Sequence, residues 1–436
     1  SNYNSMSNLE CKYIFKKGNK KGKCCGIINC CKHQLKLKIP HKLHKTIKTI
    51  NSIDNFEQII KTQILTNDNI KHKILNLDTN IENKTVIMKH YHSLCKLDTN
   101  TTEYYKHRSY VDYSLNVPWN KYYNIKDHIN TEQGTLVKDF IMSIKKEFDK
   151  CIYGMDNVKN EIINYICKFI SNPNSQKNNL ALYGSAGVCK TKFVKILSQI
   201  LNLPVRIIPL GGVKDSSFFI GHNFTYVESN YGIIMQSIID SKIMNPILYF
   251  DELDKVSQAD TGKDIYAVLS NLTDSTVNTT FTDHYFRGMK FDLSKVFYVF
   301  TFNDISKIDK VLLDRLNVIY VETPSKKDRA KILSDYCLND IIKNIGMKSI
   351  NFESECYTHL VNYVDSVIDI KISSGIRESI RILEKILLEI NKEILCETNI
   401  QVEIIVFDQY LIYFNKLKSQ FLLEPNDNQN SFMMYI

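Results

Sequence analysis

The stretch Gly184-Ser-Ala-Gly-Val-Cys-Lys-Thr191 decides the fold of this chain. An apolar run precedes it at residues 180–183 and a helical pattern follows it at residues 193–200, so the sequence predicts a strand, a glycine-rich loop and a helix. Such a loop points its backbone N–H groups at an anion, and the helix start adds positive potential. We expect Lys190 to reach the terminal phosphates of a nucleotide and Thr191 to ligate magnesium. The residues expected to bind the nucleotide are Gly184, Ser185, Ala186, Gly187, Val188, Cys189, Lys190 and Thr191.

Two carboxylates, Asp251 and Glu252, follow a second apolar run at residues 245–250. A strand can end in acids merely because it reaches solvent, but after a phosphate loop the pair indicates a nucleoside-triphosphate hydrolase. We expect Asp251 to hold magnesium and Glu252 to polarise the attacking water. Cys189 departs from the pattern, which has glycine before the lysine, and a side chain with φ > 0 there costs about 1–2 kcal/mol. Since the other catalytic positions keep the expected residue types, we expect an active ATPase.

Short apolar strands alternate with helical segments from about residue 147 to 323, which predicts a parallel α/β sheet covered by helices. The five expected strands are residues 180–183, 205–209, 247–250, 296–301 and 318–321. The phosphate loop after the first strand and the acids after the third fit the fold of the AAA+ ATPases. Strands disappear from about residue 324 to 417, where helical periodicity predicts a lid domain.

Several motifs resemble the ATPase module of Lon proteases, in the same order and spacing. They are residues 110–120, 153–159, 210–215, 221–227, 281–285, 291–294, 312–316 and 374–378. The resemblance covers about residue 106 to 415 and implies ATP and magnesium as cofactors, a ring of subunits, and a protein substrate. Lon continues into a protease domain, whereas this chain stops at Ile436, so no peptidase is expected in it.

The resemblance also implies roles for single residues. Asn303 matches the sensor that orients water, Arg315 the arginine finger that reaches a neighbouring subunit's ATP, and Arg377 the lid sensor. Tyr226 and Val227 match the pair that grips polypeptide in the pore. Ile152 and Tyr153 match residues that border the adenine. The alternatives are a turn asparagine, a surface salt bridge for Arg315 and a packing role for Tyr226.

The N-terminal arm carries the basic charge of the chain. Residues 1–50 hold twelve lysines and one acid, Glu10, while the whole chain has a formal net charge of +9. The arm could bind nucleic acid or an acidic protein, or be a solvated segment without a partner. Its cysteines resemble zinc-knuckle modules of large DNA viruses. Either a zinc site or a segment of reactive thiols fits them. The preferred zinc ligands are Cys11, Cys25, Cys30 and His33, with Cys24 and Cys31 as substitutes.

Length and composition predict several domains in a protein of 436 residues. The expected divisions are a zinc-binding basic segment 1–40, a lysine- and asparagine-rich helical or linker region 41–105, a helical segment 106–146, the ATPase domain 147–323, the lid 324–417 and a tail 418–436. We expect His41, His44, His90 and His92 to be surface residues rather than ligands. The first residues lack the apolar core of a secretory signal and no run suits a membrane span, so we expect an intracellular protein, cytoplasmic or in a viral replication compartment.

Three functions remain open from the sequence. The leading hypothesis is an ATP-driven ring, expected to be hexameric, that unfolds, translocates or remodels proteins. The second is a nucleic-acid-associated remodeller that uses the basic arm. The third is a nucleotide-gated scaffold that binds ATP without turnover.

Overall fold

The computed structural model describes residues 67–125, 137–172, 175, 178–226, 229–257, 260–348, 350–367, 376–396 and 404–421. Contacts divide the chain into residues 1–70 and residues 71–436, and the fold below is that of the second unit. The expected zinc ligands Cys11, Cys25, Cys30 and His33 lie outside the described residues, as do His41, His44 and Val227. A search of the described helices finds none that is both long and apolar enough for a membrane span.

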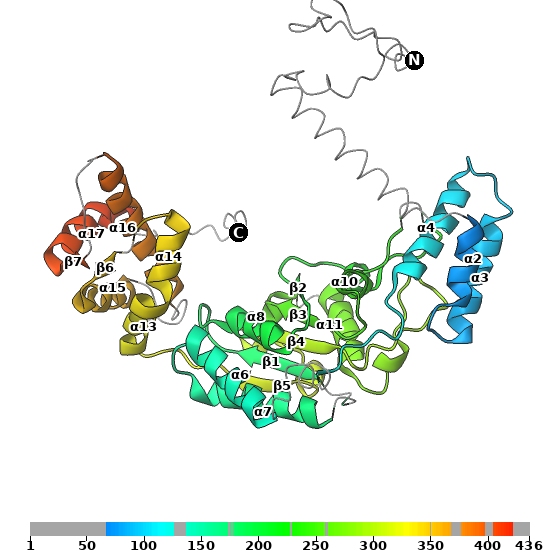
Figure 1. The fold of residues 1–436 in the computed structure, drawn as a ribbon, viewed down its shortest axis with the longest axis horizontal. Helices are drawn as coiled ribbons and strands as arrows, with labels where there is room; N and C mark the ends of the chain where they lie inside the picture. Colours follow the sequence, from blue (N-terminus) through cyan, green and yellow to red (C-terminus); the bar gives the residue numbers. More distant parts are fainter. Residues whose placement is uncertain are drawn as a thin grey trace, which may run out of the picture. The chain divides into compact units, whose positions relative to one another are not determined.

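A central sheet of five parallel strands runs in the order β2-β3-β4-β1-β5 (Figure 1). The strands are β1 (Asn179–Tyr183), β2 (Val205–Pro209), β3 (Ile247–Asp251), β4 (Phe297–Phe302) and β5 (Asn317–Tyr320). All four neighbouring pairs are parallel, so the predicted α/β fold class is confirmed. Because parallel strands end at one edge of a sheet, the phosphate loop after β1 meets Asp251 at the end of β3 and Asn303 just after β4.

Helices flank this sheet (Figure 1). They are α6 (Val137–Cys151), α7 (Asp156–Ser171), α8 (Lys190–Leu201), α9 (Ser217–Ile220), α10 (Ile233–Ser241), α11 (Asp260–Thr273) and α12 (Lys310–Leu313), with the 3-10 turns η1 (Leu253–Lys255), η2 (Asn278–Thr280) and η3 (Ile305–Lys307). Phe148 of α6, Ile166 of α7 and Leu197 of α8 share one buried core with strands β1, β3, β4 and β5. Burying each such side chain contributes about 1.5–3 kcal/mol. This packing holds β1 and α8 on either side of the phosphate loop.

Three helices precede the α/β part: α2 (Asn67–Leu75), α3 (Ile81–Leu94) and α4 (Thr102–Asn116). The side chains of Asn80 and Thr101 cap α3 and α4 by accepting a backbone N–H bond from the first turn. The buried side chain of Asn83 in α3 forms hydrogen bonds with both polar groups of the Lys290 backbone. Its Nδ2 donates to the carbonyl at 2.9 Å, and its Oδ1 accepts from the amide at 3.0 Å. These two bonds fasten α3 to the loop before β4.

His90 of α3, expected at the surface, is partly buried in an aromatic cluster. Its ring stacks on Tyr110 with centroids 3.7 Å apart and meets Phe224 edge-on at 4.9 Å. Its Nδ1 lies 3.0 Å from Nδ1 of His107. Burial, followed by His107, lowers the pKa of His90 to about 4. His90 follows buried Ile87 by three residues, and this helical spacing places both on the packed face of α3.

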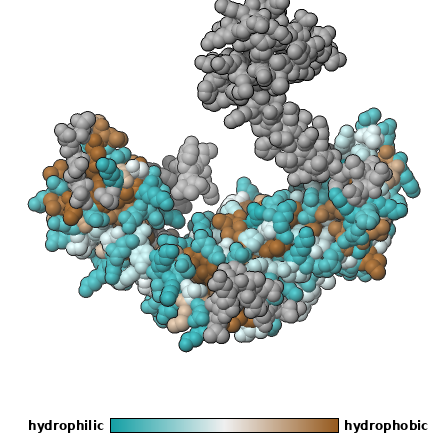
Figure 2. Space-filling view, in the orientation of Figure 1, coloured by the Kyte–Doolittle hydropathy of each residue, from teal (hydrophilic) through white to brown (hydrophobic). Residues whose placement is uncertain are grey.

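The C-terminal part is mainly helical. It contains α13 (Lys326–Ile332), the π-helical turn η4 (Leu333–Cys337), α14 (Leu338–Ile345), α15 (Ser354–Val367), α16 (Arg377–Cys396) and α17 (Phe407–Phe421) around a core of its own. Two short strands, β6 (Asn351–Phe352) and β7 (Ile404–Ile405), pair in parallel, which corrects the expectation that strands are absent here. Helix α17 also continues to Phe421, beyond the predicted domain end at 417. Hydrophobic residues reach the surface of this part, among them Leu395 and Ile412 (Figure 2).

Candidate active site

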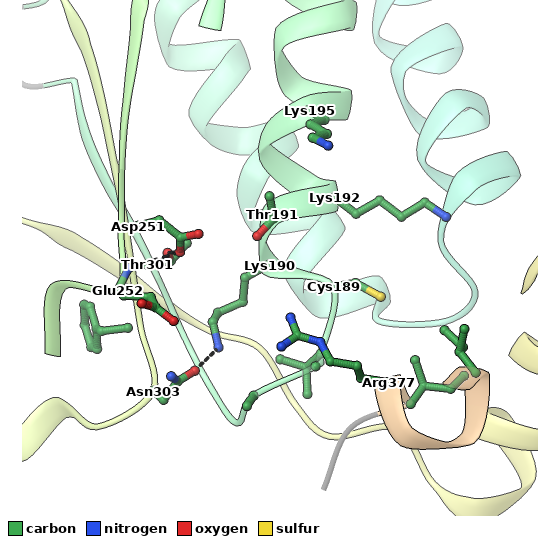
Figure 3. A pocket seen from close by; sticks show the side chains of 16 residues that line it. Cys189, Lys190, Thr191, Lys192, Lys195, Asp251, Glu252, Thr301, Asn303 and Arg377 are labelled. Carbon is green, nitrogen blue, oxygen red and sulfur yellow. Dashed lines mark hydrogen bonds between the residues drawn. The ribbon is translucent and has the colours of Figure 1, made fainter. Parts of the chain in front are cut away.

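A cavity of about 580 Å³ opens at the carboxyl edge of the sheet (Figure 3). Its lining combines the phosphate loop, the start of α8, the acids after β3, the end of β4 and the start of α16. The residues are Ala186, Gly187, Val188, Cys189, Lys190, Thr191, Lys192, Lys195, Asp251, Glu252, Thr301, Phe302, Asn303, Ile376, Arg377 and Ile380. Most residues that the sequence assigned to a nucleotide site therefore meet in one cavity.

The backbone of the phosphate loop is tightly constrained. Gly184 leaves no room for a side chain, because a Cβ there would lie 2.3 Å from the carbonyl oxygen of Val321. Gly187 has φ 80°, in the left-handed region that favours glycine. Cys189 also has a positive φ, 65°, so it carries the strain foreseen from the sequence, about 1–2 kcal/mol. Burial raises the pKa of its thiol, with Lys192 acting in the opposite direction.

The ammonium group of Lys190 is held by three oxygens. Its Nζ donates to the carbonyls of Gly184 at 2.6 Å and Ser185 at 2.9 Å and to Oδ1 of Asn303 at 2.7 Å (Figure 3). Burial lowers the pKa of Lys190 to about 8, although Asp254 and Asp251 act in the opposite direction. Burial makes the positive charge of Lys190 less favourable, and a phosphate group bound beside it would stabilise that charge. The site therefore favours an anionic ligand.

The two acids after β3 have different surroundings. Oδ1 of Asp251 accepts the Glu252 backbone N–H at 3.0 Å and a hydrogen bond from the Thr301 hydroxyl. Glu252 is exposed to the cavity and has φ 58°, a strained value for a residue with a side chain. Strained backbone of this kind clusters at functional sites. Two hydrogen bonds thus hold the Asp251 carboxylate in place, whereas the Glu252 side chain is exposed in the cavity.

Two hydroxyl groups near this carboxylate were missed by the sequence reasoning. The hydroxyl of Tyr249 lies 3.1 Å from Oγ1 of Thr191 and 3.1 Å from Oγ1 of Thr301. Both residues lie in the apolar runs that were predicted as strands, and the sequence reasoning gave neither of them a role. Strand alternation could have identified them, because residues two apart lie on the same face of a strand. Tyr249 shares the face of Asp251, and Thr301 shares the face of Asn303.

A second cavity, of about 310 Å³, adjoins the first through shared residues such as Cys189 and Ile376. Ile152 and Tyr153, expected beside the adenine, line it, together with Tyr336 of the helical part. The side chain of Lys159, only 3% exposed, donates to the Ile152 carbonyl at 2.7 Å and pairs with Asp149 at 2.7 Å. These contacts of the buried lysine fix the backbone at Ile152, whose side chain lines the cavity.

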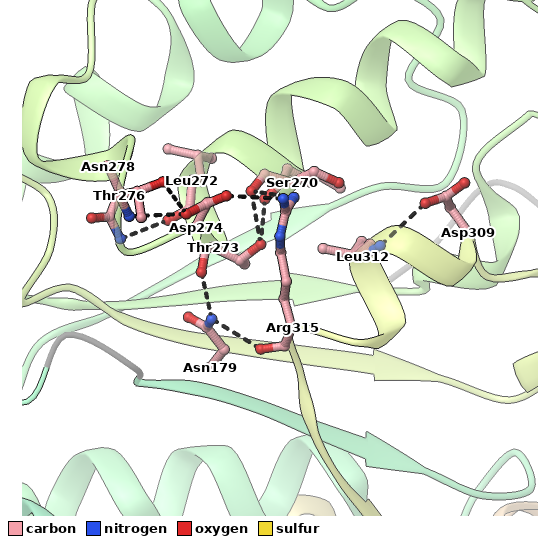
Figure 4. Close-up of polar contacts among 11 residues, drawn as sticks. Asn179, Ser270, Leu272, Thr273, Asp274, Thr276, Asn278, Asp309, Leu312 and Arg315 are labelled. Atoms are coloured by element: carbon pink, nitrogen blue, oxygen red, sulfur yellow. Dashed lines mark hydrogen bonds and ion pairs between the residues drawn. The ribbon is translucent and has the colours of Figure 1, made fainter.

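Arg315 does not belong to either cavity. Its Nη2 lies 2.9 Å from Oδ2 of Asp274 and its Nη1 donates to the Ser270 carbonyl at 3.1 Å (Figure 4). The side chain is 31% exposed and borders a separate hollow with Tyr266 and Asp309. Its position agrees with a residue that serves a neighbouring subunit's site, and its ion pair agrees with the alternative of a salt bridge.

Tyr226 is 62% exposed beside Phe224 of the aromatic cluster, and it borders a hollow with Tyr105 and Tyr113 of α4. Such an exposed ring is available for contact with a polypeptide.

No group of three or more His, Cys, Asp or Glu residues in the described ranges could hold a metal ion. These ranges do not include the cysteines of the N-terminal arm.

ATP with magnesium fits the main cavity. The loop and the start of α8 supply backbone N–H groups, and Lys190 and Arg377 supply positive charge. Thr191 and Asp251 offer hydroxyl and carboxylate oxygens, the ligand types that magnesium prefers. A side chain at Gly184 would break the loop geometry. The fold and the cavity together have the architecture of a P-loop nucleotide-binding module.

Comparison with known proteins agrees with this class. The family model "ATPase family associated with various cellular activities (AAA)" matches residues 180–323, so the chain carries an AAA ATPase module. More particularly, the module is Lon-like. The Lon protease homolog of Acanthamoeba polyphaga mimivirus is 30% identical over 366 residues, which cover 80% of this chain and 34% of that protein.

Cellular relatives give the same result. The Lon protease of Clostridioides difficile (strain 630) is 28% identical over 364 residues, covering 83% of this chain and 43% of that protein. The mitochondrial Lon protease homolog of Yarrowia lipolytica is 32% identical over 260 residues, covering 60% of this chain and 21% of that protein. The chain thus spans less than half the length of these relatives, and the similarity concerns their shared part.

Proposed function

We propose that this chain hydrolyses ATP in the cavity between the sheet edge and the start of α16. One observation carries the proposal: the phosphate loop, the acid pair after β3 and the polar end of β4 line one cavity. The parallel sheet brings these segments to one edge, but it does not require a lysine, two acids and an asparagine there. A site that only binds nucleotide would not need Glu252 facing open space opposite the loop.

Each residue has a role in this proposal. Lys190 and Arg377 neutralise the phosphate oxygens, and Asn303, which the Lys190 ammonium group already contacts, orients the attacking water. Glu252 accepts the proton of that water. Thr191 and Asp251 would hold magnesium, which supplies charge stabilisation between the phosphates when bound. Ile152 and Tyr153 would contact the adenine.

The proposal includes a ring of subunits, expected to be hexameric. Arg315 lies outside the nucleotide cavity of its own chain, so an ATP molecule that it contacts would be bound by a neighbour. An arginine supplied in this way accelerates phosphoryl transfer by about 10³–10⁵. Assembly would therefore control turnover.

The substrate we propose is an unfolded polypeptide. The relatives are named as Lon proteases, and the exposed ring of Tyr226 offers a flat contact that suits chain of almost any sequence. The proposal concerns unfolding, translocation or remodelling by the ATPase module alone. We place this activity inside the cell, in the cytoplasm or a viral replication compartment, because one relative is viral.

A nucleic-acid remodeller is the second candidate, favoured by the charge of residues 1–50, with twelve lysines against one acid. The deciding experiment measures magnesium-dependent ATP hydrolysis by the protein and by Glu252→Gln, with unfolded protein or with DNA added. Turnover that vanishes in Glu252→Gln supports the ATPase, and the polymer that stimulates it identifies the substrate class. Equal and negligible rates with retained ATP binding would overturn the proposal in favour of a nucleotide-gated scaffold.

A further inference from the structure

Three hydroxyl groups connect the two side chains that would hold magnesium. Oγ1 of Thr191 lies 3.1 Å from the hydroxyl of Tyr249, and that hydroxyl lies 3.1 Å from Oγ1 of Thr301. The Thr301 hydroxyl donates in turn to Oδ1 of Asp251. The series begins at the phosphate loop, crosses β3 and β4, and ends on the acid after β3 (Figure 3 shows Thr191, Thr301 and Asp251).

The carboxylate sets the direction of every bond in this series. An ionised carboxylate can only accept, and each hydroxyl group has a single proton to donate. Because Thr301 donates its proton to Asp251, it can only accept from Tyr249. Tyr249 has then used its own proton, so it can only accept from Thr191. Tyr249 also hydrogen-bonds Asp251 directly, so its proton goes either to Thr301 or to the carboxylate; in both arrangements Thr191 is the donor to Tyr249.

This direction decides which side of Thr191 faces the cavity. The Thr191 proton points at Tyr249, so the lone pairs of its oxygen are left for a cation. Tyr249 is 1% exposed and Thr301 is 1% exposed, so water cannot take the place of either group. Bonds in such a series also polarise one another, which increases the negative charge at the first oxygen.

We propose that Tyr249 is a positioning residue for the magnesium site: through its hydroxyl it holds Thr191 with the lone pairs toward the cation and couples Thr191 to Asp251. The inference rests on the proposed function, because it assumes that Thr191 and Asp251 hold magnesium. It adds Tyr249, which does not line the main cavity and which belongs to the otherwise apolar strand β3. Loss of a partner behind a metal ligand weakens metal affinity by about 10–100-fold.

The test is a binding experiment rather than an activity assay. ATP binding to full-length Glu252→Gln protein is measured by calorimetry over a series of magnesium concentrations and in EDTA. Adding Tyr249→Phe should raise the magnesium concentration needed for half of the affinity gain by about tenfold. Binding in EDTA should stay unchanged, because the phosphate loop and Lys190 are intact. A merely structural defect would weaken binding in both conditions.

Two further variants make the result decisive. Thr301→Val breaks the same series at its next member and should shift the magnesium dependence in the same direction; it also carries the test if Tyr249→Phe does not fold. Tyr298→Phe is the matched control on β4, since its equally buried hydroxyl donates to the Leu293 carbonyl, away from the cavity. It should leave the magnesium dependence unchanged.

The outcomes separate the inference from the proposed function. If Glu252→Gln protein binds ATP with a clear magnesium gain and Tyr249→Phe and Thr301→Val share that same dependence, the inference is wrong and the ATPase proposal stands. If the parent protein shows no magnesium-dependent ATP binding, the proposed function fails and the inference falls with it.

Discussion

The guanidinium group of Arg315 is paired with Asp274 inside a single subunit, with Nη2 and Oδ2 2.9 Å apart (Figure 4). The pair forms where α11 ends and β5 begins, and the side chain of Asn179 donates to the Thr273 carbonyl and to the backbone carbonyl of Arg315. Hydrogen bonds from Thr276, followed by Arg315, hold the pKa of Asp274 below its usual value. Arg315 is thus ordered by contacts within its own subunit, and in the proposed role between subunits it would exchange Asp274 for a neighbour's nucleotide.

Mixing two inactive variants tests whether Arg315 acts between subunits. Arg315→Ala retains its own acid pair, and Glu252→Gln retains its arginine. Each variant alone should lose turnover by about 10³ or more. Mixed before assembly, they should regain part of the activity, because a Glu252→Gln subunit supplies the arginine to an Arg315→Ala site. The check is ATP hydrolysis against mixing ratio.

Recovery should peak at intermediate ratios. Zero activity at every ratio would contradict a role between subunits and favour a purely structural ion pair with Asp274.

Cys189→Gly should stabilise the protein slightly. Glycine removes the αL strain of about 1–2 kcal/mol at φ 65°, while its greater freedom in the unfolded chain costs about 0.4–1 kcal/mol. The expected net gain in the free energy of unfolding is about 0–1.6 kcal/mol. Cys189→Ala, which keeps the strain, is the control. Urea denaturation of both variants checks the order, and a glycine variant less stable than the alanine variant would contradict it.

The histidine pair of α3 and α4 should make stability depend on pH. His90 has a folded pKa of about 4 against an ordinary value of 6.5, so the folded protein binds fewer protons than the unfolded chain between these values. The stabilising contribution is present above pH 6.5 and is lost as pH falls toward 4. We expect a loss of about 2 kcal/mol over this range.

Urea denaturation at several pH values measures this loss. His90→Gln should flatten the dependence, while His72→Gln, at an exposed position on α2, should not. If the free energy of unfolding of His90→Gln depends on pH as steeply as that of the parent protein, another group causes the dependence.

Tyr226→Ala should weaken the response to unfolded protein. Truncating an exposed aromatic contact that binds a partner commonly reduces affinity by about tenfold or more. The concentration of unfolded protein that gives half-maximal stimulation of ATP hydrolysis should rise accordingly. Tyr226→Phe is the matched variant, because the proposed contact uses the ring rather than the hydroxyl. Equal effects of the two substitutions would argue against gripping by the ring.

Local patterns were enough to predict the sheet and most of the cavity. A glycine-rich loop between a strand and a helix has few alternative structures, and the acids at the end of β3 must lie beside it once the strands are parallel. The positive φ of Cys189 could be anticipated for the same reason, because the loop dictates backbone geometry whatever residue occupies it.

Contacts between distant segments were harder to predict. Tyr249 reads as one more apolar residue of a buried strand until Thr191 and Thr301 are seen on either side of its hydroxyl. The burial of His90 depends on Phe224, far away in the chain. The pairing of β6 with β7 joins segments of two residues each, too short to produce an alternating pattern.

The attachment of α3 to the α/β part has a practical consequence for fragments. The similarity to Lon proteases suggested a module beginning near residue 106, but Asn83 bonds the backbone of Lys290 on both sides and His90 covers Tyr110 and Phe224. A fragment cut at residue 106 would lose both hydrogen bonds of α3 to Lys290 and would uncover the rings of Tyr110 and Phe224. Such a fragment should aggregate on expression, and limited proteolysis of the intact protein should spare the α3–α4 connection until the sheet itself unfolds.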